Sequence, residues 1–186
     1  LPGSGNPAGS MPELPAEPLL TSLQRFKLRS RVNLAIDSAH HAQGLLIPPN
    51  SGLQATETDV PAAMTLRIPG RLADRVLSIA PTTADTDAEA LDQWHCLDMA
   101  AGWIWLAEPQ QNRWTPQMLS LDRLDAFSLK KGCYPGQEIV ARTHYLGKSK
   151  RRLQAIIGAG MQIDQPLSAD GREFGNVVDA NSAGNF

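Results

Sequence analysis

The spacing of hydrophobic residues predicts two helices in the first half of the chain. Residues 18–26 have apolar side chains at every third or fourth position, which is typical of a short amphipathic helix. Residues 88–101 show the same spacing over a longer stretch and predict a helix with one buried face. An aspartate, Asp85 or Asp87, is placed to cap its beginning, and Gly102 is placed to end it.

Alternating or short apolar runs predict several strands. The segment 27–36 alternates basic or polar residues with apolar ones and predicts a strand with one solvated face. Residues 73–80 fit a strand or a helix, and 37–61 are polar and rich in turn residues. A short helix or turn is expected around 119–127. Further strands are predicted at 65–70, 103–106, 153–158 and 175–179, with a turn-rich stretch at 164–171.

Composition places the chain among ordinary globular proteins. Of its 186 residues, 42% are hydrophobic and 19% are charged, and no apolar run is long enough to cross a membrane. The first residues lack the pattern of a signal peptide. Two cysteines, Cys96 and Cys133, are too few for a disulfide framework and favour a reducing compartment. A reducing compartment favours a cytoplasmic location, and a bacterial cytoplasmic protein is the default expectation.

Charge is distributed unevenly, although the net charge is only −2. Residues 120–152 hold eight basic and three acidic side chains, and the rest of the chain holds 9 basic and 16 acidic ones. Such asymmetry is typical of a surface that meets an anionic ligand or partner, although a solvated face gives the same pattern.

The sharpest chemical feature is the segment 130–138, Lys-Lys-Gly-Cys-Tyr-Pro-Gly-Gln-Glu. Two lysines just before Cys133 create a positive field, which favours the thiolate and predicts a lowered thiol pKa. Gly132 and Gly136 allow a tight backbone path. A helix is expected after the loop, with Pro135 in its first turn. A buried cysteine that packs as a small hydrophobic residue is the alternative.

Three stretches of this sequence resemble the YgfZ family of folate-binding proteins, which are related to the aminomethyltransferase of the glycine cleavage system. They are 114–122, 127–142 and 145–153, and the segment 23–32 looks like a fourth. The family's Lys-Gly-Cys-Tyr-x-Gly-Gln-Glu motif stands unbroken at 131–138. The resemblance covers most of residues 19–178.

The resemblance implies an α+β fold, with a GcvT-like folate-binding domain followed by a small antiparallel β-barrel. The expected organisation is a loop or linker at 1–18, the later part of the folate-binding domain at 19–150 and the start of the barrel at 151–186. The first part of the folate domain, which precedes residue 19 in the family, is missing from this arrangement. Related proteins often carry an acid where this chain has Ala100.

The resemblance also implies a folate-dependent accessory role in the assembly or repair of iron–sulfur proteins, including radical enzymes that modify tRNA. Tetrahydrofolate is the expected ligand, and iron–sulfur client or assembly proteins are the expected partners. Cys133 would be the reactive group, tuned by Lys131, and it could ligate iron transiently. The remaining motif residues, assigned to folate binding or to the motif's structure, are Gly132, Tyr134, Gly136, Gln137, Glu138 and Arg142.

Other interpretations of the same residues remain open. The chain could be an aminomethyltransferase-like enzyme or a non-catalytic module that binds folate or RNA. Glu138 and Arg142, four residues apart, could form an ion pair on the helix. The basic run 148–152 lacks interleaved aromatic residues, so a solvated role or one facing an anionic folate tail is favoured over direct RNA binding. The four tryptophans are expected in the core, although one could flank a pteridine ring. No tightly bound metal is expected, because the histidines lack zinc-site spacing.

Overall fold

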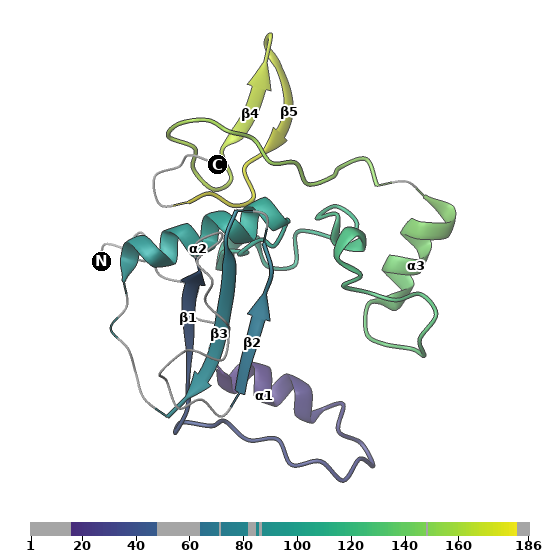
Figure 1. The fold of residues 1–186 in the computed structure, drawn as a ribbon. Helices are drawn as coiled ribbons and strands as arrows, with labels where there is room; N and C mark the ends of the chain where they lie inside the picture. The colour runs from purple at the N-terminus through teal and green to yellow at the C-terminus, as the bar shows by residue number, and fades with distance from the viewer. Residues whose placement is uncertain are drawn as a thin grey trace, which may run out of the picture. The chain divides into compact units, whose positions relative to one another are not determined.

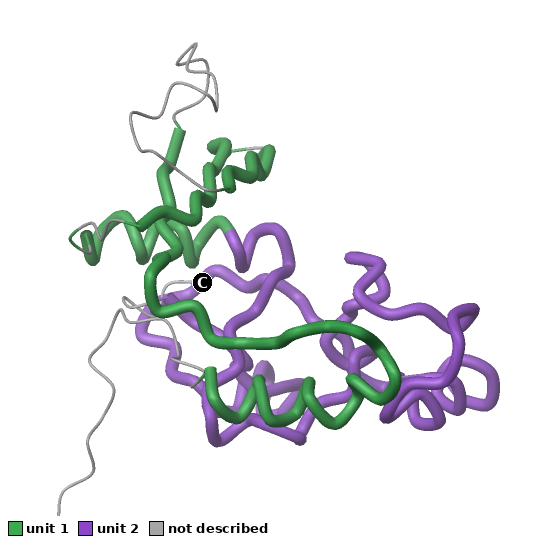
Figure 2. Tube along the Cα trace, turned by 90° about the horizontal axis from the view of Figure 1, so that it is seen from below, with its two compact units in different colours: residues 1–97 green, residues 98–186 purple. Residues whose placement is uncertain are grey.

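The computed structural model describes residues 16–47, 64–70, 72–81, 85, 87–147 and 149–181, and it contains both helices and antiparallel strands (Figure 1). The chain divides into two compact units, Leu1–Leu97 and Asp98–Phe186, which Figure 2 distinguishes by colour. A loop or linker was predicted at 1–18. Residues 1–15 lie outside the described part of the chain, and residues 16–18 belong to a helix. The predicted domain boundary near residue 150 stays a prediction.

The first unit is built on a three-stranded antiparallel sheet. The strands are β1 (His41–Ile47), β2 (Met64–Ile68) and β3 (Asp74–Ala80), arranged in the order β1-β3-β2. Helix α1 (Ala16–Gln24) confirms the amphipathic helix predicted at 18–26. Strand β2 confirms the strand predicted at 65–70. At 73–80, where the sequence fitted a strand or a helix, the structure has the strand β3.

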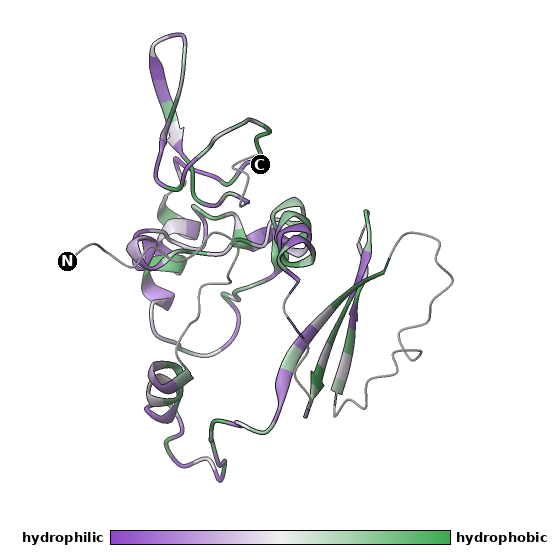
Figure 3. Cartoon of the chain, turned by 90° about the vertical axis from the view of Figure 1, so that its left-hand side faces the viewer, coloured by the Kyte–Doolittle hydropathy of each residue, from purple (hydrophilic) through white to green (hydrophobic). Residues whose placement is uncertain are grey.

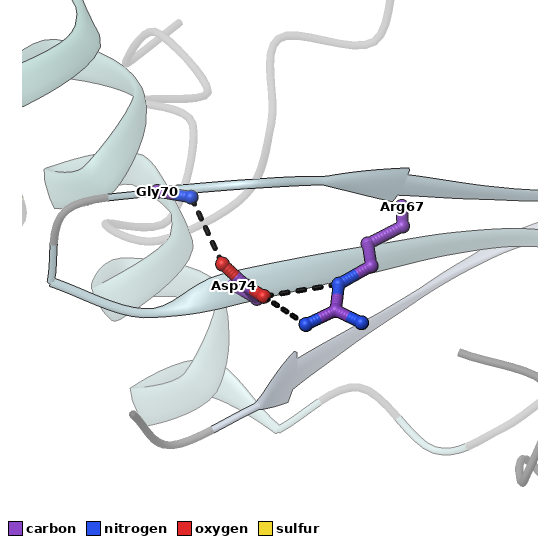
Figure 4. Close-up of polar contacts among 3 residues, drawn as sticks. All are labelled: Arg67, Gly70 and Asp74. Carbon is purple, nitrogen blue, oxygen red and sulfur yellow. Dashed lines mark hydrogen bonds and ion pairs between the residues drawn. The ribbon is translucent and has the colours of Figure 1, made fainter. Parts of the chain in front are cut away.

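The central strand β3 supplies most of the buried residues of this sheet, and Ile47 of β1 is also buried. Val76 and Ala80 are almost fully buried, whereas Leu45 of β1 and Leu66 of β2 are about half exposed. Figure 3 shows hydrophobic residues along these strands. At the connection between β2 and β3, the Asp74 carboxylate accepts hydrogen bonds from the Arg67 guanidinium and from the Gly70 N–H, which closes the turn (Figure 4).

Helix α2 (Ala88–Ala101) follows the sheet and has the two ends that the sequence predicted. The Asp87 carboxylate caps its first turn by accepting hydrogen bonds from two backbone N–H groups, at 2.9 and 3.2 Å. Gly102, with φ of 81°, and the bond from the Trp103 N–H to the Asp98 carbonyl end the helix in a Schellman motif. The Cζ3 atom of the Trp94 ring lies 2.8 Å from the position of a Cβ built on Gly44, so a side chain there displaces the ring.

The strand predicted at 27–36 is wrong. The Ser30 N–H donates a hydrogen bond to the Lys27 carbonyl, which closes a turn. Within this turn Leu28 has a φ of 42° and is 88% exposed. A left-handed residue interrupts the alternation that a strand needs, and no described strand pairs with this segment. The missed strand is β1, inside the region that the sequence predicted to be turn-rich, of which residues 48–61 lie outside the described residues.

The second unit contains little regular structure. Its elements are the 3₁₀ helices η1 (Glu108–Gln110) and η2 (Leu121–Leu124), helix α3 (Gln137–Leu146), and the hairpin of β4 (Pro166–Ala169) and β5 (Arg172–Asn176). The 3₁₀ helix η2 confirms the short helix or turn predicted around 119–127. Every described helix of the chain is too short or too polar to span a bilayer.

Two strand predictions in this unit are wrong. Residues 103–106 form no strand, because the Trp105 N–H is bonded to the Asp179 carboxylate at 2.7 Å rather than to a neighbouring strand. Residues 153–158 are also irregular. The hairpin turn at Asp170 and Gly171, both with positive φ, lies inside the stretch 164–171 that was predicted to be turn-rich, but β4 occupies half of that stretch. Strand β5 overlaps the strand predicted at 175–179 only at residues 175 and 176. The described residues contain this hairpin but no closed barrel.

A cluster of polar side chains joins segments of the second unit that are far apart in the sequence. The Asp164 carboxylate accepts hydrogen bonds from Arg113 at 2.7 Å and from the side chain of Gln110 at 3.2 Å. Gln110 is fully buried. The hydrogen bond from Arg113, and after it that from Gln110, lowers the pKa of the Asp164 carboxyl. The cluster therefore holds η1 to the chain just before β4, more than 50 residues later.

Candidate functional site

The motif segment forms an exposed loop directly before α3. Cys133 is exposed, and neither Cys133 nor Cys96 forms a disulfide. Gly136 is the residue before the first helical turn and has a φ of 82°, a value that strains any residue with a side chain. The helix begins at Gln137, so Pro135 precedes the helix and is not in its first turn as predicted. The loop thus presents the thiol to solvent, which excludes the alternative of a buried packing cysteine.

Lys131 interacts with a ring of the same loop. Its ammonium nitrogen lies 4.9 Å from the centroid of the Tyr134 ring, a cation–π contact. Lys131 and Lys130 are both exposed. This contact ties one of the two predicted positive charges to the residue that follows Cys133.

A side chain from the segment 114–122, one of the stretches that resemble the YgfZ family, attaches helix α3 to the rest of its unit. The Gln117 amide donates a 2.8 Å hydrogen bond to the Val140 carbonyl, and Val140 is the buried residue of the helix. The side-chain oxygen of Gln117 and the hydroxyl of Tyr134 are buried and have no hydrogen-bond partner among the described residues. Buried polar atoms without a partner are costly and are a feature of ligand sites.

The predicted ion pair between Glu138 and Arg142 is absent from the described part of the chain, although both residues lie on α3. Both side chains are exposed, and a surface pair at this spacing contributes little in any case. Their charges therefore remain directed to solvent or to a ligand.

A cavity of about 450 Å³ lies elsewhere in the same unit. None of the predicted motif residues lines it. Its lining does include part of the basic run and one tryptophan, which the sequence did not predict to lie together. The lining residues that carry charge or a large ring are Trp114, Arg123, Lys150, Arg151, Arg152, Phe174 and Asp179.

Trp114 is contacted by two guanidinium groups. The Arg113 and Arg151 guanidinium carbons lie 5.8 and 5.9 Å from the centroid of its ring. The indole N–H of Trp114 is buried and has no acceptor among the described residues. Arg123 and Asp179 were not singled out from the sequence, and no local pattern around them distinguishes them from ordinary surface residues.

Within the described ranges, no three histidine, cysteine or acidic side chains gather as they would around a metal ion. His95 is buried in α2, and the ring of His144 meets that of Tyr145 edge to face, with centroids 4.9 Å apart. Neither arrangement is that of a set of metal ligands.

The chain is similar to proteins of known name. No model of a protein family matches it. It is 36% identical to the tRNA-modifying protein YgfZ of Cronobacter sakazakii over 119 residues, or 58% of this chain. It is 38% identical to the protein of that name from Colwellia psychrerythraea over 96 residues, or 49% of this chain. The Shigella sonnei protein of that name is 30% identical over an alignment of 191 residues that covers 88% of this chain.

The alignments span only part of each relative. They cover 36%, 29% and 59% of the three proteins, so the chain spans less than two thirds of the length of each. All three carry the same name, and the longest alignment extends over most of the present chain. Over this matched length, the chain belongs to the YgfZ family.

Proposed function

We propose that the chain is the later part of a folate-dependent accessory factor that assembles or repairs iron–sulfur proteins, among them tRNA-modifying radical enzymes. The observation that carries the proposal is the exposed Cys133, presented on a loop in which the whole motif 131–138 is intact. The relatives' name, tRNA-modifying protein, supports the connection to tRNA modification.

Cys133 is the reactive group of this proposal. A solvent-exposed thiol can act as a nucleophile, exchange with another thiol or ligate iron transiently, and the motif is compatible with each use. A four-thiolate cluster site cannot be built from the two cysteines of this chain. Any cluster handled here therefore needs further ligands from a partner or from a second copy of the chain.

Tetrahydrofolate is the proposed ligand, and the surroundings of α3 fit it. The Tyr134 hydroxyl and the Gln117 side-chain oxygen are buried and unpartnered among the described residues. A pteridine ring has both donors and acceptors along its edge and can satisfy such atoms. The proposal thus assigns Tyr134 and Gln117 to hydrogen bonding with the ring, and Cys133 to the chemistry.

The fold that accompanies this function is a GcvT-like domain with a C-terminal β-barrel, of which the β4–β5 hairpin is the first part. A two-stranded hairpin is marginal by itself and needs further strands or a packing partner, which supports the larger architecture. The bacterial relatives and the absence of a disulfide between the described cysteines are consistent with a bacterial cytoplasmic location.

Tetrahydrofolate binding by isothermal titration calorimetry tests the ligand and separates it from the thiol. We expect the wild-type chain to bind, Tyr134→Phe to bind about three- to tenfold more weakly because a hydrogen bond is removed, and Cys133→Ser to bind as wild type. If wild type shows no binding, folate is excluded as the ligand. Catalysed transfer of a one-carbon group from the folate would instead favour an aminomethyltransferase.

A further inference from the structure

The cavity of the second unit has a strongly positive lining. Four cationic side chains line it, Arg123, Lys150, Arg151 and Arg152, and Asp179 is its single acidic residue. The Asp179 carboxylate already accepts the hydrogen bond from the Trp105 backbone N–H. With four cationic side chains against one carboxylate, the lining keeps a cationic excess.

The three described basic residues of the run also form no ion pair elsewhere in the described chain. No ion pair is formed by Lys150, Arg151 or Arg152 with any described acidic side chain, and all three are exposed. Arg113, by contrast, is held by Asp164 at 2.7 Å. Three unpaired cations in consecutive positions repel one another, and an anion bound among them relieves this repulsion.

The structure adds an aromatic surface that the basic run lacks in the sequence. Trp114 lines the cavity, and the Arg151 guanidinium lies 5.9 Å from its ring centroid. On the same ring, Arg113 is fixed by its ion pair. A cation beside a large ring is the arrangement by which proteins hold a nucleotide, with the base stacked on the aromatic face and the phosphate on the cation.

We propose that this cavity binds single-stranded RNA, with one base against Trp114 and the adjoining phosphates on Arg151, Arg152 and Lys150. A small inorganic anion contacts the cations alone, whereas a nucleotide also contacts the ring beside them. A duplex keeps its bases stacked on one another, so its bases cannot reach the ring. The amide side chains of Gln154 and Asn176 also line the cavity and suit a ribose 2′-hydroxyl, which both donates and accepts.

This inference goes beyond the proposed function and does not depend on it. The cavity lining does not include Cys133 or the other motif residues, so RNA binding and thiol chemistry are separable. Cys133→Ser should leave RNA binding unchanged, and the RNA-binding variants should leave tetrahydrofolate binding unchanged. Either proposal can then fail while the other stands.

Fluorescence anisotropy of a labelled, mixed-sequence RNA strand of about 12 nucleotides, titrated with the full chain at low salt, tests the site. We expect Arg151→Gln and Arg152→Gln each to weaken binding several-fold. Each should also reduce the slope of log affinity against log salt by about 0.7 for every phosphate that the variant no longer neutralises. Arg172→Gln is the matched control, because Arg172 is an exposed arginine on β5 outside the cavity, and it should bind as wild type.

The role of Trp114 is tested without a variant that risks the fold. An abasic strand of the same length keeps the phosphates and lacks the bases, and we expect wild type to bind it at least about fivefold more weakly. Four results would overturn the proposal: no RNA binding at low salt, equal binding of the abasic strand, equal binding of the matching DNA strand, or equal weakening in Arg172→Gln. Displacement of the RNA by tetrahydrofolate with a polyglutamate tail would assign the cavity to folate instead.

Discussion

At the scale of single residues, the Asp74 carboxylate illustrates how one side chain closes a turn. It accepts hydrogen bonds from the Arg67 guanidinium and from the Gly70 N–H at 3.1 Å (Figure 4). The bond from Arg67, and after it that from Gly70, lowers the pKa of Asp74 below its ordinary value of 3.8. A carboxyl with a lowered pKa stabilises the fold at pH values above its unfolded pKa, and this contribution disappears as pH falls through the folded pKa.

We therefore predict that Asp74→Asn lowers the thermal unfolding midpoint at about pH 7 and that the difference from wild type narrows below about pH 3.8. The measurement is circular dichroism melting of both proteins over this pH range. Asp122→Asn is the control, because the exposed Asp122 forms no ion pair with a described residue, and its difference from wild type should stay small throughout. A pH-independent deficit in Asp74→Asn would contradict the pKa argument.

The residues of the candidate site were predictable from the sequence to different degrees. The exposed loop position of Cys133 follows from the local Gly and Pro residues that surround it. The unpartnered Tyr134 hydroxyl and the partner of Gln117, the Val140 carbonyl, do not, since both depend on how α3 packs. Local patterns carry no information about such tertiary contacts.

At the scale of elements, the start of α3 depends on the backbone of one glycine. Gly136 has a φ of 82° and nothing within 4 Å of an added Cβ, so a side chain there meets backbone strain and no steric contact. We predict that Gly136→Ala destabilises the chain by about 1–2 kcal/mol in urea unfolding. Gly132→Ala is the matched control. Gly132 also has open space around it but lies outside the left-handed region, so we expect a change within about 0.5 kcal/mol. Equal effects of the two would contradict this account.

The N-terminus of α2 gives a second prediction at this scale. Asp87 accepts hydrogen bonds from the backbone N–H groups of Glu89 and Ala90. We expect Asp87→Ala to lower the free energy of unfolding by about 1 kcal/mol and Asp87→Asn to retain most of it, because asparagine caps helices as well as aspartate does. Urea midpoints of the three proteins measure this, and a decrease in Asp87→Asn as large as in Asp87→Ala would show that the cap is not the cause.

Elements with local signals at both ends were predictable, and elements that depend on pairing were not. Helix α2 has a cap residue before it and a glycine after it, and its bounds match the prediction. The alternation at 27–36 produces no strand, because Leu28 turns the chain and no described strand pairs with it. Strand β1 begins with His41, Ala42, Gln43 and Gly44, which have little strand propensity, and its pairing with β3 decides its conformation.

At the scale of the whole molecule, contacts between distant parts of the sequence create the second unit's chemistry. Trp114 meets Arg151 at the cavity, and Asp164 joins Arg113 and Gln110. The uneven charge of 120–152 is visible in the sequence, but the aromatic ring that the basic run meets comes from outside that run. From the sequence, a solvated run or one facing a folate tail was favoured, because the run contains no aromatic residue and its contact with Trp114 depends on the fold.

The central claim is that the Cys133 thiol carries the function of this chain, and one complementation measurement tests it most directly. Cys133→Ser and Cys96→Ser are expressed from the gene in a bacterial strain that lacks it, and the fraction of tRNA bearing a modification installed by an iron–sulfur radical enzyme is measured. Because Cys133 is exposed, Cys133→Ser should have the same thermal unfolding midpoint as wild type. Cys96 lies in α2, outside the motif, and Cys96→Ser is the control. We predict that Cys133→Ser falls to the level of the empty strain while Cys96→Ser retains the modification. Full modification with Cys133→Ser would contradict the account.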